Sequence, residues 1–206
     1  MKKSNKNFSD KINHKYDIYE FRHAATLFKN DFPDEYKQFT ELLEAFEVSH
    51  KDILTPGGRK SPIAQKFDDE LYKNGWLEKQ WDITISIDKA TKPSPTHKVD
   101  YYKNKVAIEL EWNNKDPFYD RDLNNFRLLH ELDVISVGII VTRADELQEI
   151  FSELGKGSSY GASTTRVGKL LPKIIGGGAA ETPLLVFAIN KNACKPDAKK
   201  LVESTE

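Results

Sequence analysis

The segment from Val106 to Trp112 constrains the fold more than any other part of this 206-residue sequence. Its apolar residues alternate strictly with an alanine and two glutamates, Glu109 and Glu111. This alternation predicts a β-strand that sends its apolar side chains to one face and both glutamates to the other. The preceding Asn104-Lys105 pair is typical of a two-residue hairpin loop, because Asn tolerates a positive φ. The segment therefore predicts a β-hairpin with one apolar and one acidic face.

This hairpin places a third acid beside the two glutamates. With a two-residue loop, Lys103 pairs with Val106, and Asp100 lies opposite Glu109 with the two Cβ atoms roughly 5 Å apart. Two like charges at that separation destabilise a hairpin unless a divalent cation lies between them. Acidic residues on a solvent-facing strand are also ordinary, and a pair of glutamates alone would favour that interpretation. The apolar face, the third acid in register and the Asn-rich sequence that follows favour a metal site.

The composition limits the class of protein. The formal charge is −1, with 31 lysines and arginines against 32 acidic residues, so a polyanion would have to bind at a local basic patch. Cys194 is the only cysteine, which excludes an intramolecular disulfide and a cysteine-ligated zinc cluster. The sequence has no signal-like segment and no apolar run long enough to span a membrane. We therefore expect a soluble, cytoplasmic protein.

The order of the expected elements predicts an α/β fold in which helices flank a central mixed β-sheet. We expect one domain over residues 16–190, with a disordered arm at 1–15 and a mobile tail at 191–206. The run at 134–141 is apolar throughout and is typical of a strand covered on both faces. The expected helices are 34–48, 61–73, 116–132, 144–154 and 163–173, and the expected strands outside the hairpin are 16–22, 83–87, 134–141 and 183–189.

Two loops have the composition of a phosphate-binding surface. Segment 156–169 combines three basic residues with glycines and hydroxyl groups and contains no acid. Small residues let backbone N–H groups approach phosphates, and a helix that starts near Ser163 would add a favourable dipole. A flexible surface loop leading into a basic helix explains the same composition equally well. The candidate nucleic-acid-binding residues are Tyr160, Ser163, Thr164, Thr165, Arg166 and Lys169 here, and Arg59 and Lys60 in the Pro- and Gly-containing loop 55–60.

Three groups of residues carry a resemblance to a known family: Ser61-Pro62-Ile63-Ala64 with Gly75-Trp76, Asp100 with strand 106–111, and Ile135-Ser136-Val137-Gly138 ahead of Thr142-Arg143. Over most of residues 16–190 the chain resembles the BglII/BstYI family of type II restriction endonucleases, within the broader PD-(D/E)xK nuclease fold. Two departures from the broader motif mark the site: Val99 stands in place of the motif's proline, and Glu111 stands where the broader fold has lysine and BglII-like enzymes have glutamine.

The resemblance implies a homodimer that cuts both strands of double-stranded DNA at a short palindromic site by Mg²⁺-dependent hydrolysis and leaves 5′-phosphates. It implies that Asp100 and Glu109 bind Mg²⁺ together with the backbone carbonyl of Leu110. Mg²⁺ prefers oxygen ligands of this kind. Glu111 would either accept the proton of the attacking water or bind a second metal ion. A cognate methyltransferase of the same restriction-modification system would protect host DNA without forming a stable complex with the enzyme.

The helix expected at 116–132 carries Phe126, Leu129 and Leu132 at helical spacing. Because a two-fold symmetric enzyme presents the same elements to each half of a palindrome, this apolar stripe is a candidate dimer interface. Burial in the monomer's own core is the more common reason for such spacing.

Two other functions stay open at this point. A protein of this fold that binds DNA without cutting it is consistent with Glu111 in the lysine position and with the basic loop. A glycoside hydrolase that uses Glu109 and Glu111 as acid and base is consistent with two carboxylates on one strand face. The nearest aromatic residue, Trp112, points to the opposite face, whereas sugar clefts are usually lined with aromatic side chains.

Overall fold

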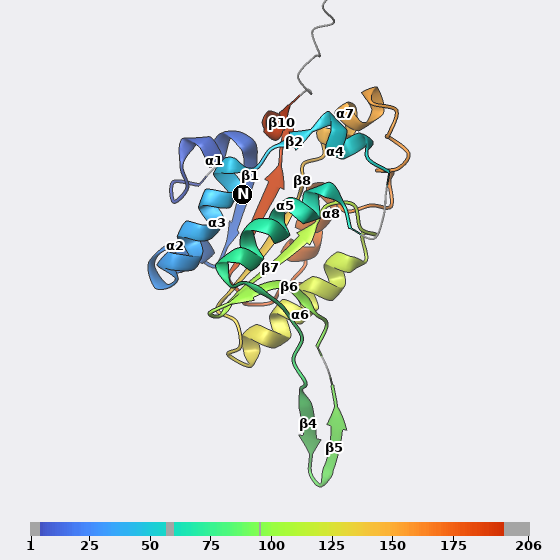
Figure 1. The fold of residues 1–206 in the computed structure, drawn as a ribbon. Helices are drawn as coiled ribbons and strands as arrows, with labels where there is room; N and C mark the ends of the chain where they lie inside the picture. Colours follow the sequence, from blue (N-terminus) through green and yellow to red (C-terminus); the bar gives the residue numbers. More distant parts are fainter. Residues whose placement is uncertain (1–4, 57–59, 95, 196–206) are drawn as a thin grey trace, which may run out of the picture.

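A six-stranded mixed β-sheet of order β1-β9-β8-β7-β6-β3 lies at the centre of the computed structural model, which describes residues 5–56, 60–94 and 96–195 (Figure 1). β7, β8 and β9 run parallel, while β1, β6 and β3 each run antiparallel to their neighbours. The expected mixed sheet is therefore confirmed. The strands of this sheet are β1 (Tyr16–Phe21), β3 (Leu77–Lys79), β6 (Val99–Lys103), β7 (Val106–Glu111), β8 (Val137–Arg143) and β9 (Leu184–Ile189).

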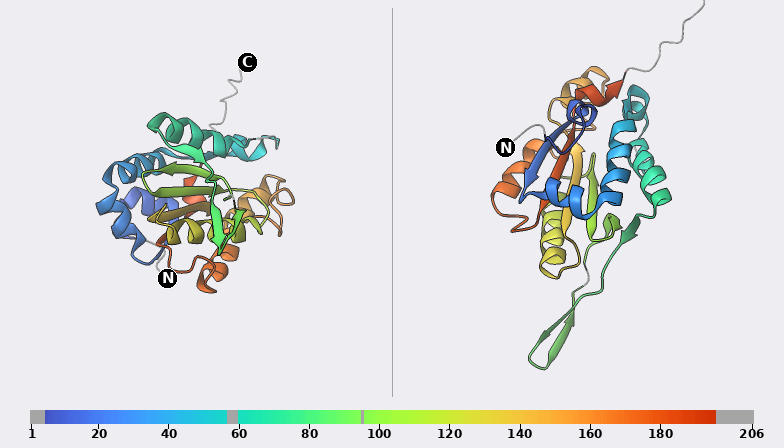
Figure 2. Two further views of the ribbon diagram at one scale, coloured as in Figure 1. Left: turned by 90° about the horizontal axis from the view of Figure 1, so that it is seen from below. Right: turned by 90° about the vertical axis from the view of Figure 1, so that its left-hand side faces the viewer.

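Helices cover both faces of the sheet, so each face is buried in its own apolar core (Figure 2). On one face, α3 and α5 pack against the side of β7 that carries Ile108, and on the other, α6 and α8 pack against the side that carries Ala107. No helix in the described parts of the chain is long and apolar enough to cross a membrane. The helices are α1 (Asp10–Lys15), α2 (Ala24–Asp31), α3 (Pro33–Ala45), α4 (His50–Leu54), α5 (Pro62–Leu71), α6 (Phe118–Glu131), α7 (Leu147–Glu153) and α8 (Val167–Ile175).

Local capping signals fix the start of α5, as expected. Ser61 is its N-cap and accepts a hydrogen bond from the Ala64 backbone N–H, and Pro62 is its first residue. α8 begins at Val167 instead of Ser163, because the Thr165 backbone N–H donates to the Asn114 carbonyl in a neighbouring loop. Ser163 lies in a turn and Thr164 pairs with Lys115 in an isolated β-bridge, so the helix dipole expected near Ser163 lies farther along the chain.

The start of α6 also differs from the expectation by one residue. Pro117 is the N-cap of α6 and not its first helical residue, and no side chain caps this end. Asp116, the expected cap, instead forms an ion pair with Lys169 at 2.6 Å. The side chain of Asp116 thus ties α6 to α8 and does not satisfy the first turn of its own helix.

Both chain ends contain ordered structure within the ranges expected to be disordered. Residues 10–15 form α1, in which Ile12 is fully buried and Lys15 Nζ donates to the backbone carbonyls of Glu44 and Phe46 at 2.8 Å each. Near the other end, β10 (Cys194–Lys195) pairs with β2 (Val48–Ser49). A few apolar anchors and backbone acceptors are enough to fix these polar segments. Within the expected arm and tail, residues 1–4 and 196–206 lie outside the described residues.

A two-stranded ribbon, β4 (Thr84–Ile87) and β5 (Ala90–Pro93), projects beyond the main sheet (Figures 1 and 2). The strand expected at 83–87 is confirmed as β4, whereas β5 occupies part of a segment expected as loop. The ribbon joins β3 to β6 along the chain, so it starts and ends beside the hairpin that carries Asp100.

Candidate active site

The β6–β7 hairpin has the register that the sequence predicts. Asn104 and Lys105 both have positive φ, 43° and 64°, and form the two-residue loop. Lys103 pairs with Val106 across the hairpin, and the same register continues along the two strands. One residue beyond the last paired positions, Asp100 therefore lies opposite Glu109.

At this end of the hairpin, carboxylate side chains take the place of backbone carbonyls as hydrogen-bond acceptors. Glu109 Oε2 accepts from the Asp100 backbone N–H at 3.3 Å, and Asp100 Oδ2 accepts from the Leu110 backbone N–H at 3.0 Å. These two bonds hold both carboxylates close to the backbone of the opposite strand. The geometry brings together Asp100, Glu109 and Leu110, the three residues expected to form a metal site.

The acidic face of β7 is buried under α6 and is not the solvent-facing surface that acidic residues on a strand ordinarily form. Glu109 and Glu111 are each only 1% exposed. α6 adds a fourth acid, the fully buried Asp122, and an adjacent cation, Arg121. Arg121 Nη2 lies 2.6 Å from Asp122 Oδ1 and 3.6 Å from Glu111 Oε1.

Sequence reasoning missed Asp122 and Arg121 as site residues. A signal was present, because Asp122 lies three residues after Tyr119 and four before Phe126, on the buried side of α6. An acid in the apolar stripe of an amphipathic helix requires a partner, and Asp122 has two: the adjacent Arg121 and the Glu111 carboxyl group on β7.

Burial raises the pKa of each acid in this cluster. Burial first, and then repulsion from Asp100, raise the pKa of Glu109 well above its usual value. Burial, with the adjacent Asp122, raises the pKa of Glu111 to about 9, and burial raises the pKa of Asp122 to about 6. The Asp100 pKa is raised by burial as well. Glu111 therefore retains its proton at neutral pH when no cation is bound.

These residues fit a hard divalent cation. Glu109 Oε1 is buried without a hydrogen-bond partner, and Glu111 and Asp122 are buried against each other through their carboxyl groups. Carboxylate oxygens are preferred ligands of Mg²⁺. Among the described residues, however, no group of three or more acidic, histidine or cysteine side chains is arranged to hold a metal ion. Two of the carboxylate oxygens accept backbone N–H groups instead. Cation binding would therefore require these side chains to turn away from the backbone.

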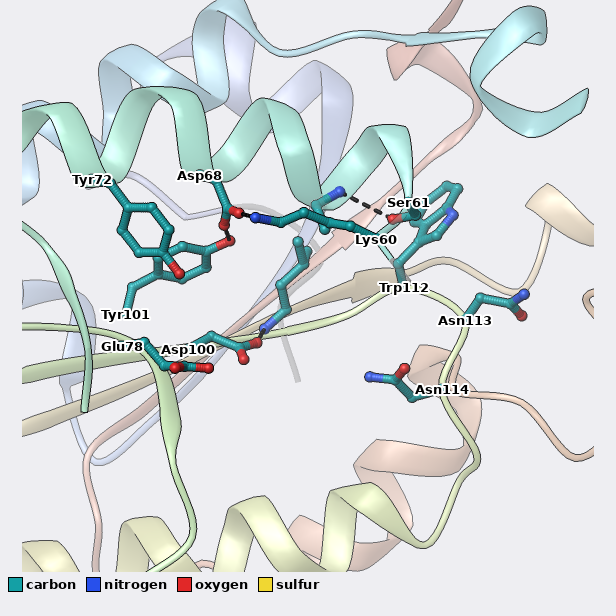
Figure 3. A pocket seen from close by; sticks show the side chains of 12 residues that line it. Lys60, Ser61, Asp68, Tyr72, Glu78, Asp100, Tyr101, Trp112, Asn113 and Asn114 are labelled. Atoms are coloured by element: carbon teal, nitrogen blue, oxygen red, sulfur yellow. Dashed lines mark hydrogen bonds and ion pairs between the residues drawn. The ribbon is translucent and has the colours of Figure 1, made fainter. Parts of the chain in front are cut away.

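A pocket of about 490 Å³ opens onto Asp100 and Leu110 from the α5 side (Figure 3). Lys60 lines it and forms an ion pair with Asp68, which also accepts a 2.6 Å hydrogen bond from the Tyr101 hydroxyl. Lys60, expected to bind nucleic acid, thus shares a pocket with Asp100. Arg59, the other basic candidate of this loop, lies outside the described residues.

Part of the expected phosphate-binding loop is buried in the structure. Tyr160, Thr164 and Thr165, three of the residues expected to bind nucleic acid, are buried among protein atoms. The fully buried guanidinium of Arg143 from β8 donates to Thr164 Oγ1 at 2.6 Å and to the Tyr160 carbonyl at 3.2 Å. Trp112 Nε1 donates to the Tyr160 hydroxyl at 3.3 Å. The interior side of this loop is thus a packing surface.

Three other candidates of this region remain accessible. Ser163 is exposed and its hydroxyl accepts from Lys115 Nζ at 3.2 Å. Arg166 forms an ion pair with Asp145 at 3.3 Å and is partly exposed. Lys169, partly exposed, is held by Asp116. Partly exposed ion pairs of this kind stabilise a fold little, so these cations are free to exchange partners.

The apolar stripe of α6 belongs mainly to the monomer's own core. Phe126 and Leu129 are fully buried, which confirms the intramolecular interpretation for both residues. Leu132 is 48% exposed, just beyond the end of the helix.

A mixed sheet covered by helices on both faces, with acids facing each other at the end of an antiparallel hairpin, defines a nuclease of the restriction-endonuclease-like fold. The family model described as Restriction endonuclease BglII/BglIII matches residues 16–189, and the chain belongs to this family. The protein is therefore a nuclease that acts on DNA, in a class that generally uses divalent metal ions. No curated protein matches the chain. Family membership removes the support for a glycoside hydrolase.

Proposed function

We propose that this protein is a type II restriction endonuclease that hydrolyses both strands of double-stranded DNA at a short palindromic site, with Mg²⁺ as cofactor and 5′-phosphates as products. One observation carries the proposal: the carboxylates of Asp100 and Glu109 face each other across the β6–β7 hairpin, and Asp100 borders an open pocket. A homodimer would present the same site to both strands of a palindrome.

We assign the metal ligands to Asp100, Glu109 and the backbone carbonyl of Leu110. When bound there, Mg²⁺ would polarise the phosphate to be cut and lower the pKa of a water molecule. Glu111 accepts the proton of the attacking water, or serves as a further oxygen ligand. The raised pKa of Glu111 means that it must lose its proton before it can act as a base.

We assign phosphate contacts to Arg59 and Lys60 near the α5 start, and to Ser163, Arg166 and Lys169 near the α8 start. The accessible residues of this set have partners that DNA phosphates can replace. Substitution of one lysine or arginine that contacts a phosphate would reduce the slope of log binding constant against log salt concentration by about one unit. A cutting enzyme also needs a cognate methyltransferase to protect host DNA.

Digestion of unmethylated phage DNA tests the function. We expect discrete fragments with wild-type protein and Mg²⁺, and intact DNA with EDTA or with Asp100→Asn. Sequencing of the fragment ends gives the site and the cut position. Asp100→Asn should still bind this site in Ca²⁺, because the amide keeps the side-chain shape.

Two results would contradict these assignments. Mg²⁺-dependent cutting by Asp100→Asn would show that the metal site lies elsewhere. Binding without cutting by the folded wild type would instead establish the non-cleaving DNA-binding protein, and Glu111 would then be the first position to examine.

A further inference from the structure

Arg121 occupies a position that the function outlined above does not yet use. Its Nε and Nη2 both donate to Asp122 Oδ1, at 2.9 Å and 2.6 Å, and Nη2 also lies 3.6 Å from Glu111 Oε1. The guanidinium lies over the ring of Phe118, 4.2 Å from its centroid. Among the described residues, Arg121 is the cation that forms ion pairs with the acids of this site.

The charge of Arg121 reaches the whole acid cluster. Although burial is the larger effect and raises each pKa, the positive charge of Arg121 lowers the pKa values of Asp100, Glu109, Glu111 and Asp122. One guanidinium therefore lies within electrostatic range of all four carboxyl groups. It is also 29% exposed, unlike the acids beneath it.

Asp122 fixes the direction of this guanidinium. Asp122 is fully buried in α6, so its carboxylate has little freedom to move. Its single oxygen Oδ1 accepts two of the five N–H donors of Arg121. In the described part of the chain, the Nη1 hydrogens donate to no protein atom, and the partly exposed guanidinium can offer them to a ligand.

The proposed reaction requires such a donor. Water oxygen forms a bond to phosphorus while the bond from phosphorus to the 3′ oxygen breaks. One water proton passes to a base, and the leaving 3′ oxygen takes up a proton from solvent to become a hydroxyl. Negative charge builds on the phosphate oxygens during this exchange, and a preorganised cation lowers the barrier. The planar donors of arginine match two phosphate oxygens at once.

We propose that Arg121 binds the non-bridging oxygens of the phosphate that is cut, and that Asp122 is the positioning residue that holds its guanidinium there. This inference rests on the proposed nuclease function. It gives the site a cationic side chain from α6, a different element from the hairpin that supplies the acids.

Single-turnover cleavage by Arg121→Gln, Arg121→Lys and Arg127→Gln provides the first test. Arg127 is the matched control, because it lies on the same helix and pairs with Glu131 away from the acids. We expect Arg121→Gln to lower the cleavage rate by about 10²–10³-fold, as for loss of one preorganised donor. Arg121→Lys should keep part of the rate, and Arg127→Gln should stay within about twofold of wild type, as expected for a solvent-exposed pair.

Binding measurements in Ca²⁺ separate a phosphate contact from a structural role. The probes are a duplex with the site found by end sequencing or by binding selection, and the same duplex with an uncharged methylphosphonate at the cut position. We expect Arg121→Gln to weaken binding of the normal duplex several-fold and to have no further effect on the methylphosphonate duplex. Thermal unfolding of each variant confirms that it is folded.

The outcomes distinguish this inference from the proposed function. Normal cleavage by folded Arg121→Gln, or an equal loss of binding on both duplexes, would overturn the role of Arg121 and leave the nuclease intact. If the wild-type protein binds DNA without cutting it, comparison of its binding to the normal and methylphosphonate duplexes with that of Arg121→Gln still tests the phosphate contact. Wild-type protein that neither binds nor cuts DNA would overturn both proposals.

Discussion

The two faces of β7 are equally buried and chemically opposite. On one face, Val106, Ile108 and Leu110 join the apolar core that α3 and α5 cover. On the other, Glu109 and Glu111 lie against α6 beside Asp122. Neighbouring residues of a single strand thus experience the same loss of water with contrary effects on the free energy of folding.

This difference shows how the site is positioned. Burial of an aliphatic side chain contributes about 1.5–3 kcal/mol to folding, whereas a buried carboxylate is unfavourable unless it is protonated or paired. The apolar face therefore anchors the strand rigidly, and the acidic face uses that rigidity to keep reactive carboxylates in a site with little water. Function and stability have been divided between residues one position apart.

Glu109→Gln should have the largest effect and should separate the two faces most clearly. Loss of the charged oxygen removes a proposed metal ligand, and we expect cleavage to fall by about 10³-fold or more. The melting temperature of the metal-free protein should stay equal or rise, because a buried ionisable group is replaced by a neutral one. Quantitative digestion and thermal unfolding of the same preparation measure both effects. Near-normal cutting would show that Glu109 has no essential role.

Ile108→Ala should produce the reverse pattern one residue away. Removal of this fully buried side chain should lower the free energy of unfolding by about 2–5 kcal/mol, and Ile108→Val should lower it by about 0.5–1.5 kcal/mol. Urea denaturation measures this loss. Below the melting temperature, the folded protein should still cut DNA. Loss of cleavage in a fully folded Ile108→Val variant would indicate that both faces contribute directly to the chemistry.

The acidic face should make stability depend on pH in the metal-free protein. The folded protein holds a proton on Glu111 up to about pH 9, whereas the unfolded chain releases it near its ordinary pKa of 4.5. The stabilising contribution is complete below the unfolded value and is lost as the pH rises through the folded value. We therefore expect the urea midpoint to fall between about pH 5 and pH 9.

Glu111→Gln should make that pH dependence shallower, because one of the raised carboxyl groups is removed. Mg²⁺ at about pH 8 should raise the midpoint of the wild type, since a ligand that binds the folded state stabilises it. A urea midpoint that is flat with pH in the metal-free wild type would refute this description of the cluster.

Tyr160→Phe should have the smallest effect and tests the apolar end of β7. The substitution removes the 3.3 Å hydrogen bond from Trp112 Nε1 and should lower the free energy of unfolding by about 0.5–1.5 kcal/mol. Because Tyr160 is buried, the cleavage rate and the recognised site should stay the same. A change in site preference would restore a base-reading role for Tyr160.

The sequence was sufficient for the hairpin because its determinants are local. Alternation over residues 106–112 defines the faces, and the two-residue loop at Asn104 and Lys105 defines the register. The facing positions of Asp100 and Glu109 then follow from counting. The apolar run that became β8 was equally readable, because burial on both faces leaves no polar positions.

The remaining parts of the site depend on tertiary packing. Asp122 and Arg121 join the cluster only because α6 packs across the acidic face of β7, and nothing local predicts which face a helix covers. The composition of the loop at 160–165 is that of a solvated loop, yet the buried Arg143 guanidinium donates hydrogen bonds to the Tyr160 carbonyl and to Thr164 Oγ1. A buried guanidinium can reorganise a polar loop in a way that residue types alone do not indicate.

The carboxylates that close the end of the β6–β7 hairpin give the site a measurable backbone signature. Asp100 Oδ2 and Glu109 Oε2 accept the backbone N–H groups of Leu110 and Asp100, so the proposed ligands also protect two amides at the end of the strand pair. When those oxygens turn towards a cation, both amides lose an acceptor. Loading with Mg²⁺ should therefore speed hydrogen-deuterium exchange at residues 100 and 110 while the centre of the sheet stays protected.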